Sequence, residues 1–142
     1  RRFERVFEEG NVVYIDDYAH HPSELKVAIE AAKMLFPNSR ITGIFQPHLF
    51  SRTNDFVDGF ATELDELDEV ILMDIYPARE LPMKGVTSEI IFDKMKNSEK
   101  VMVTKSTLME ELKGRDIEVL LTLGAGDIDT FVLKIKNWLS EK

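Results

Sequence analysis

The sequence predicts an α/β domain with a mostly parallel sheet of about six strands and helices on both of its faces. Strand-like runs rich in β-branched and aromatic residues alternate with helix-like segments along most of the chain, the pattern of repeated βαβ units. Only the start departs from this alternation. There, two strand-like runs flank Gly10-Asn11, a turn sequence that predicts an antiparallel hairpin.

The strands are predicted from short apolar runs bounded by polar residues or turns. They are residues 3–8, 12–15, 41–45, 69–75, 100–103 and 117–123.

The helices are predicted from apolar residues at helical spacing. The first begins at Pro22, whose fixed φ suits a first helical turn, and it ends before Pro37-Asn38. The second carries Phe56, Phe60 and Leu64 on one stripe. The predicted helices are 22–36, 55–67, 88–95, 107–112 and a last one that follows Gly124–Asp127 and reaches Leu139.

Composition limits the classes of protein to consider. A chain of 142 residues with 44% hydrophobic and 31% charged residues can bury one core. The net charge of −8 argues against nucleic-acid binding, and no apolar run approaches the roughly 20 residues that span a bilayer. The absence of cysteine fits a reducing compartment such as a cytoplasm. Because the chain begins with Arg1, we expect it to be part of a longer protein.

One stretch, residues 11–24, carries most of the reactive side chains. Its apolar strand-like start stops abruptly, and ionisable or polar side chains then crowd the turn that leads into the first helix. They are Asp16, Asp17, Tyr18, His20, His21 and Glu24. In open α/β sheets ligands bind at the carboxyl ends of the strands, so this turn is a candidate site.

Other polar residues follow later strands in the same way. His48 and Arg52 come after the third predicted strand, Tyr76 after the fourth, and Gly124–Asp127 after the last. Parallel strands joined by right-handed crossovers end at a common edge. We therefore expect these loops to meet the Asp17 and His20 turn.

The residue types alone leave three functional classes open. One is a metal-dependent phosphoesterase with Asp16, Asp17, His20, His21 and His48 as ligands. The second is a domain that handles nucleotides or other anions, and the third is a regulatory, non-catalytic nucleotide-binding module. Structural interpretations also exist: aspartates favour turns, and the glycine-rich loop before the last helix could simply form a tight turn.

The string DDYAHHPSE at residues 16–24 closely resembles the DDY(G/A)HHPTE signature of the Mur ligases. Further pieces match in order: Arg1–Glu4, FQPHLFSRT at 45–53, Tyr76–Ala78 with Glu80, and GAGDI at 124–128. The resemblance implies the Rossmann-like carboxy-terminal domain of a three-domain enzyme, with one antiparallel strand. The chain has no GxxxxGK[ST] phosphate-binding loop, which in these enzymes belongs to the central domain.

The resemblance also implies an activity. It is ATP-dependent joining of L-alanine to UDP-N-acetylmuramate through an acyl phosphate, in peptidoglycan precursor synthesis. ATP and Mg²⁺ would be required, with the metal held mainly by the central domain. The partners would be the amino-terminal and central domains of the same enzyme, and the isolated domain would be inactive. A tripeptide-recycling ligase that acts on the same sugar nucleotide is the alternative within the family.

By motif position, the resemblance assigns a role to each of seven residues. Arg2 would approach the ATP phosphates and Asp17 the ribose, both at the catalytic centre, and His21 would join the nucleotide site. The side chains expected to bind the incoming amino acid are Tyr18, His20, His48 and Arg52. A carboxylate can accept two ribose hydroxyls and a guanidinium can fork onto an anion, which fits these roles. No residue is assigned to a metal.

One position departs from the pattern. Many relatives have arginine where this sequence has Leu49 in its FQPHLFSRT loop. Leucine cannot supply the missing positive charge, so Arg52 is left as the one arginine of this loop.

Overall fold

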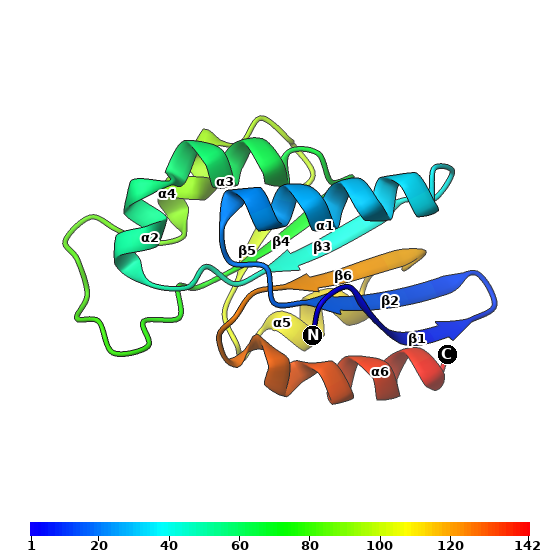
Figure 1. The fold of residues 1–142 in the computed structure, drawn as a ribbon. Coiled ribbons are helices and arrows are strands. Elements are labelled where there is room, and N and C mark those ends of the chain that lie inside the picture. The colour runs from blue at the N-terminus through cyan, green and yellow to red at the C-terminus, as the bar shows by residue number, and fades with distance from the viewer.

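The computed structural model describes all 142 residues. They form one six-stranded sheet with helices packed on both of its faces (Figure 1). No helix is long and apolar enough to cross a membrane. The elements in chain order are β1 (Glu4–Glu9), β2 (Val12–Asp17), α1 (Pro22–Leu35), β3 (Ile41–Phe45), α2 (Phe50–Asp55), α3 (Val57–Leu64), β4 (Glu69–Met73), α4 (Glu89–Lys94), β5 (Lys100–Val103), α5 (Leu108–Lys113), β6 (Val119–Leu123), η1 (Asp127–Phe131) and α6 (Val132–Ser140).

The sheet confirms the predicted class. Its strand order is β1-β2-β6-β3-β4-β5. The β1–β2 hairpin is antiparallel, with one irregularity between Arg5 and Phe7, and every other neighbouring pair is parallel. The last strand is therefore inserted between β2 and β3, where Leu121 pairs with both Ile15 and Gly43.

Two apolar layers hold the helices to the sheet. Side chains alternate between the two faces of a strand, so neighbouring residues of β2 enter different layers. Ile15 belongs to the layer under α1 and α3, whereas Tyr14 belongs to the layer under α5 and α6. Figure 1 shows α1, α3 and α4 on one side of the sheet and α5 and α6 on the other. The predicted helices on both faces are confirmed.

The predicted helix 55–67 is wrong in its boundaries. The structure has two helices there, because Phe56 leaves the helical region with φ −123° and ψ 28°. Its N–H closes α2 on the Arg52 carbonyl, while its own carbonyl accepts the first bond of α3, from Phe60. The Phe56 ring lies edge-on to His21, with 4.7 Å between centroids. The segment 46–53, expected as a loop, becomes helical from Phe50 onward.

Smaller differences concern strand and helix ends. The fourth strand ends at Met73 rather than residue 75, the last begins at Val119 rather than residue 117, and a 3₁₀ turn precedes α6. Leu67 lies beyond α3 yet is buried. It fills space that Gly43 leaves, since a Cβ there would lie 2.5 Å from a Leu67 methyl.

The two phenylalanines of the predicted helical stripe give a stability prediction. Phe60 is fully buried and its ring lies 5.3 Å from that of Phe45, whereas Phe56 is 40% exposed. Phe60→Ala should lower the free energy of unfolding by about 3–5 kcal/mol. Phe56→Ala should cost no more than about 1 kcal/mol. Urea unfolding of the two variants checks this, and equal losses would contradict the assignment of the core.

Candidate functional site

The candidate site lies where the strand order changes direction. From β2 to β5 the chain crosses over the α1 and α3 face, and it then returns to β6 past α5 on the other face. The loops after β2 and β3 therefore diverge from the loop after β6, which runs into η1 and α6. Such a divergence opens a crevice at the carboxyl ends of the strands. The expected meeting of these loops at one edge is confirmed.

Four rings from three loops form a row along this edge, which we call the ring row. It consists of Tyr18, His20, His48 and Tyr76. Their consecutive centroids are 5.8, 5.9 and 5.6 Å apart, and the last pair is stacked. His20 Nδ1 lies 2.9 Å from the Tyr18 carbonyl oxygen, so that nitrogen carries the proton and donates. Each ring except Tyr76 was a predicted site residue.

Arg52 joins the ring row through His48. Its Nη1 lies 3.0 Å from His48 Nδ1. A guanidinium only donates, so His48 Nδ1 accepts and the neutral ring carries its proton on Nε2. Burial, Arg52 and His20 together lower the pKa of His48, which favours that neutral form. Arg52 Nη1 also approaches the His48 carbonyl at 3.5 Å, and its Nε and Nη2 have no protein acceptor.

Asp17 builds the turn that carries the row. Its two carboxylate oxygens accept backbone N–H groups of Phe3 at 2.9 Å and of Ala19 at 2.8 Å. These bonds fix residues 1–3, called the amino-terminal arm, against the turn after β2. A carboxylate has about four acceptor positions, so each oxygen of this half-buried group retains one.

Asp16 is structural. It is 2% exposed and pairs with Arg1 Nε at 2.8 Å, while Thr122 Oγ1 donates to it at 2.7 Å. Thr122 also lies 2.9 Å from the Tyr14 hydroxyl, and burial raises the pKa of Tyr14. Arg1 reaches further, to the Gly124 carbonyl at 3.1 Å. This network joins the arm, β2 and β6.

The last two predicted site residues differ in their surroundings. Arg2 is exposed, and its guanidinium carbon lies 4.7 Å from the centre of the Tyr18 ring, so it extends the ring row by one cation. His21 instead caps α1: its Nδ1 accepts from the Ser23 N–H at 3.2 Å. Its ring contacts Phe56, and no hydrogen bond or ring contact joins it to the row.

The glycine-rich loop after β6 meets the row at Tyr76. Gln46 holds this loop in place, because its amide donates to Asp127 at 2.7 Å and accepts from the Ile128 N–H at 2.9 Å. Lys105 pairs with Asp127 at 2.6 Å. Burial opposes ionisation of Asp127, but the hydrogen bonds from Lys105 and Gln46 prevail and lower its pKa. Gln46, Lys105 and Asp127 line a cavity of about 330 Å³ together with Tyr76.

The ligand set of the phosphoesterase alternative does not converge. Asp16 is ion-paired, Asp17 accepts two backbone amides and His21 caps a helix. No three carboxylate or imidazole groups of the chain lie together as metal ligands.

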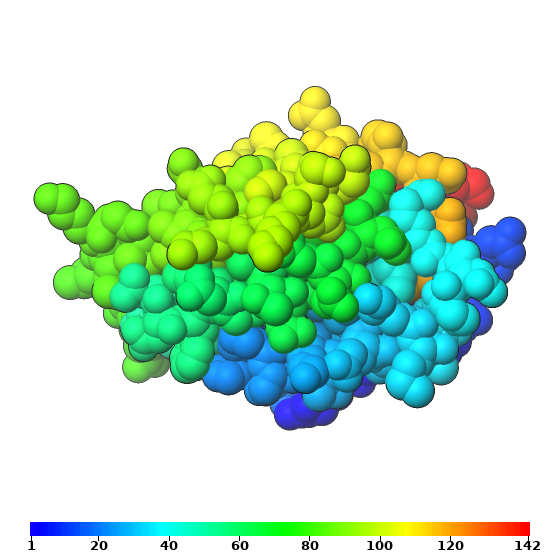
Figure 2. All heavy atoms as spheres, turned by 90° about the horizontal axis from the view of Figure 1, so that it is seen from above, coloured from blue at the N-terminus to red at the C-terminus, as the bar shows by residue number.

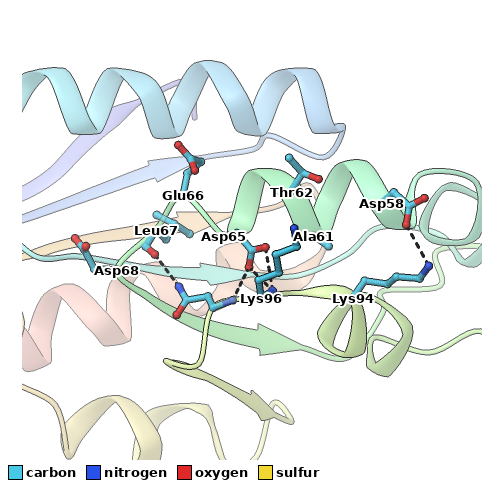
Figure 3. A pocket seen from close by; sticks show the side chains of 10 residues that line it. Asp58, Ala61, Thr62, Asp65, Glu66, Leu67, Asp68, Lys94 and Lys96 are labelled. Atoms are coloured by element: carbon cyan, nitrogen blue, oxygen red, sulfur yellow. Dashed lines mark hydrogen bonds and ion pairs between the residues drawn. The ribbon is translucent and has the colours of Figure 1, made fainter.

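A surface hollow of about 760 Å³ lies at the opposite edge of the sheet, and its lining is drawn in Figure 3. It adjoins the amino-terminal ends of β4 and β5, and most of its polar side chains have partners within the protein. Asp65 accepts the backbone N–H groups of Lys96 and Asn97, Asn97 donates to the Leu67 carbonyl, and Lys94 lies 3.5 Å from Asp58. We assign it a structural role.

Several residues of the site escaped the sequence analysis. Gln46 and Lys105 belong to no periodic pattern. Glu80 stood out only through the family resemblance, although it accepts from the Ser51 N–H at 3.1 Å. Two signals could have pointed to Gln46, namely its position directly after a buried strand and its place in the FQPHLFSRT motif.

Fold and site together define an α/β domain whose candidate site is formed by loops at the carboxyl ends of parallel strands. Residues 1–128 match the protein family described as "Mur ligase, glutamate ligase domain". The chain belongs to the Mur ligase family.

Relatives named UDP-N-acetylmuramate–L-alanine ligase are similar over nearly the whole chain. The one from Porphyromonas gingivalis is 54% identical over 140 residues, which are 98% of this chain and 31% of the relative. The one from Flavobacterium johnsoniae is 51% identical over 141 residues, which are 99% of this chain and 31% of the relative. The chain thus spans about three tenths of their length.

Two solved structures have the same fold. UDP-N-acetylmuramate-alanine ligase MurC from Thermotoga maritima is 31% identical with a TM-score of 0.79, over 100% of this chain and 30% of that one. A single domain of a Haemophilus ducreyi protein has a TM-score of 0.72 at 18% identity, over 97% of this chain and 99% of that one. The latter likeness shows the fold alone.

The Arg52–His48 bond predicts a pH dependence of stability. The pKa of His48 is lowered on folding, so its contribution is complete above the unfolded value of about 6.5 and is lost as pH falls from there toward the folded value. His48→Gln retains an acceptor but cannot titrate, so its unfolding midpoint should fall less between pH 7.5 and 5.5. The control is Asn54→Ala, an exposed substitution in α2, the helix that bears Arg52. Its pH profile should follow that of the wild type. Identical pH profiles for wild type and His48→Gln would contradict the bond.

Gly126 gives a second prediction. A Cβ at this position would lie 2.6 Å from Gln46 Oε1 and 2.6 Å from the Tyr76 ring. Gly126→Ala should therefore displace both and cost about 1–3 kcal/mol of stability. Gly114 has a φ of −82° and only one neighbour, at 3.6 Å, so Gly114→Ala should be neutral or slightly stabilising. Thermal unfolding compares the two, and equal midpoints would show that the loop has room to move.

Proposed function

We propose that this chain is the carboxy-terminal domain of an ATP-dependent ligase that joins L-alanine to UDP-N-acetylmuramate. In this reaction ATP phosphorylates the lactyl carboxylate to an acyl phosphate and ADP leaves. The alanine nitrogen then attacks the acyl carbon and phosphate departs, which forms the amide. The domain supplies the amino-acid site and part of the ATP site, and the rest of the enzyme supplies the sugar-nucleotide site and the phosphate-binding loop.

The observation that carries the proposal is the meeting of Arg52 with the ring row. Free alanine bears a carboxylate. In a site that excludes water this group needs hydrogen-bond donors, and a positively charged donor binds it most strongly. Arg52 has Nε and Nη2 without protein acceptors, and the His48 bond orients its plane. Tyr18 and His20 lie within the same row and can contribute further polar contacts.

The nucleotide would lie at the other end of the row. Asp17 retains acceptor positions that suit ribose hydroxyls, and Arg2 presents an exposed guanidinium beside Tyr18 that suits the phosphates. His21 would adjoin the nucleotide through the face of its ring that Phe56 leaves free.

Magnesium is not assigned to this domain. Mg²⁺ prefers carboxylate, phosphate and water oxygens in octahedral geometry, and no group of suitable side chains gathers here. The residues present do not fit the ion. In the complete enzyme its protein ligands would come from the central domain.

The relatives favour L-alanine as the amino acid. Those at about 50% identity carry L-alanine ligase names, while a murein peptide ligase from Psychrobacter arcticus shares the fold at 14% identity. The tripeptide-recycling activity therefore has no observation in its favour here. We propose that the complete enzyme works in the bacterial cytoplasm.

Arg52→Ala tests the proposal in the complete ligase. Charge-assisted hydrogen bonds contribute roughly 1.5–3 kcal/mol each, so the Michaelis constant for L-alanine should rise about ten- to a hundredfold. The constants for ATP and UDP-N-acetylmuramate should change little. Steady-state kinetics with each substrate varied in turn make the measurement.

Arg5→Ala is the matched control, since Arg5 pairs at the surface with Glu8 of the same strand and should leave all three constants unchanged. Leu49→Arg, added to Arg52→Ala, should partly restore alanine binding. An unchanged alanine constant in Arg52→Ala, or a loss confined to ATP, would assign this loop to the nucleotide instead.

A further inference from the structure

A long segment between β4 and α4 is fastened to the loop that carries Arg52. This segment, residues 76–87, is called the clasp loop here. It projects from the end of the molecule where the strands terminate (Figures 1 and 2). At its base the Tyr76 N–H donates to the Pro47 carbonyl at 2.8 Å and the Leu49 N–H donates to the Tyr76 carbonyl at 2.8 Å. The two loops thus continue the sheet by one parallel bridge.

Glu80 forms the second fastening. Its carboxylate accepts the Ser51 N–H at 3.1 Å and also the Ser51 hydroxyl. Helix α2 has no side-chain cap of its own, because Leu49 occupies its N-cap position. The clasp loop therefore supplies the acceptor for the first turn of the helix that bears Arg52. The hydrogen bonds from Ser51 lower the pKa of Glu80.

The fastened loops hold strained backbone. Leu49 has φ 74° and Ala78 has φ 54°, a region that non-glycine residues avoid. Leu49 is held there from both sides, since its N–H bonds Tyr76 and its carbonyl accepts the Thr53 hydroxyl at 2.8 Å. Strain of this kind persists only where the surrounding contacts impose it. Leu49 directly follows His48 and precedes α2, so its conformation sets the direction in which the helix leaves the ring row.

We propose that Glu80 is a positioning residue for the amino-acid site. It acts through Ser51 and α2 to hold Arg52 against His48, so that the unpaired N–H groups of the guanidinium face the incoming carboxylate. The inference rests on the proposed function and adds a specific residue outside the predicted site. Glu80 itself touches no substrate.

Two substitutions separate positioning from simple electrostatics. Glu80→Gln keeps an oxygen for the Ser51 N–H and an amide for its hydroxyl, but it removes the charge. Glu80→Ala removes both. If Glu80 mattered only as a negative charge near Arg52, either change would strengthen carboxylate binding. Positioning predicts instead that Glu80→Gln stays near wild type and that Glu80→Ala weakens binding.

The experiment is steady-state kinetics of the complete ligase. Glu80→Ala should raise the Michaelis constant for L-alanine about three- to tenfold, from the loss of one or two hydrogen bonds. The turnover number at saturating alanine and the constant for ATP should stay within about twofold. Ser51→Ala, which removes the hydroxyl bond to Glu80 but keeps the backbone N–H bond, should produce a smaller rise of the same kind. Glu89→Ala, at an exposed carboxylate without a side-chain partner, is the matched control.

A double variant decides whether the effect passes through Arg52. Added to Arg52→Ala, Glu80→Ala should raise the alanine constant no further, because the group being positioned is gone. If Arg52→Ala raises the constant while Glu80→Ala and Ser51→Ala do not, the positioning role is overturned and the proposed function stands. If Arg52→Ala itself has no effect, the assignment of this loop to the amino acid is overturned, and the positioning role of Glu80 with it. A lower alanine constant in Glu80→Gln would replace positioning with charge repulsion.

Discussion

The two adjacent carboxylates at the end of β2 hold the candidate site together. Because side chains alternate along a strand, Asp16 and Asp17 serve different neighbours. Asp16 binds Arg1 and Thr122 and so joins the amino-terminal arm to β6. Asp17 accepts the backbone of the arm and of its own turn. The orientation of Tyr18 and His20 follows from these bonds, and a ligand-binding role for Asp17 would be added to a structural one.

The side chains of the site are not independent, because each one is oriented by contact with the next. Arg52 is oriented by His48, His48 stacks on Tyr76, and Tyr76 packs against the glycine loop that Gln46 secures. The supports come from the loops after three strands, β3, β4 and β6. Small displacements in any loop would therefore reach Arg52, which explains why the loops are bonded to one another and not only to the sheet.

Local patterns predicted the parts of this structure that depend on local physics. Strand composition and helical spacing gave the alternation of elements, and the alternation gave a common edge for His20, His48 and Tyr76. The insertion of β6 between β2 and β3 was not predictable, since strand order depends on contacts between distant segments. His21 was assigned to the nucleotide by motif position alone, and its additional role as the cap of α1 was not predicted, because no local pattern marks it as a cap. The break at Phe56 escaped because its position fits a helical stripe while its backbone does not.

The central place of β6 has a consequence for how the chain folds. This strand is the last to be synthesised, yet it pairs with β2 on one side and β3 on the other. Until it arrives, those two strands have no common neighbour, and each exposes an unpaired edge. Long-range pairing of this kind slows folding and leaves intermediates prone to aggregate. A nascent chain that ends before residue 117 would carry every residue of the ring row and still lack the strand that brings their loops together.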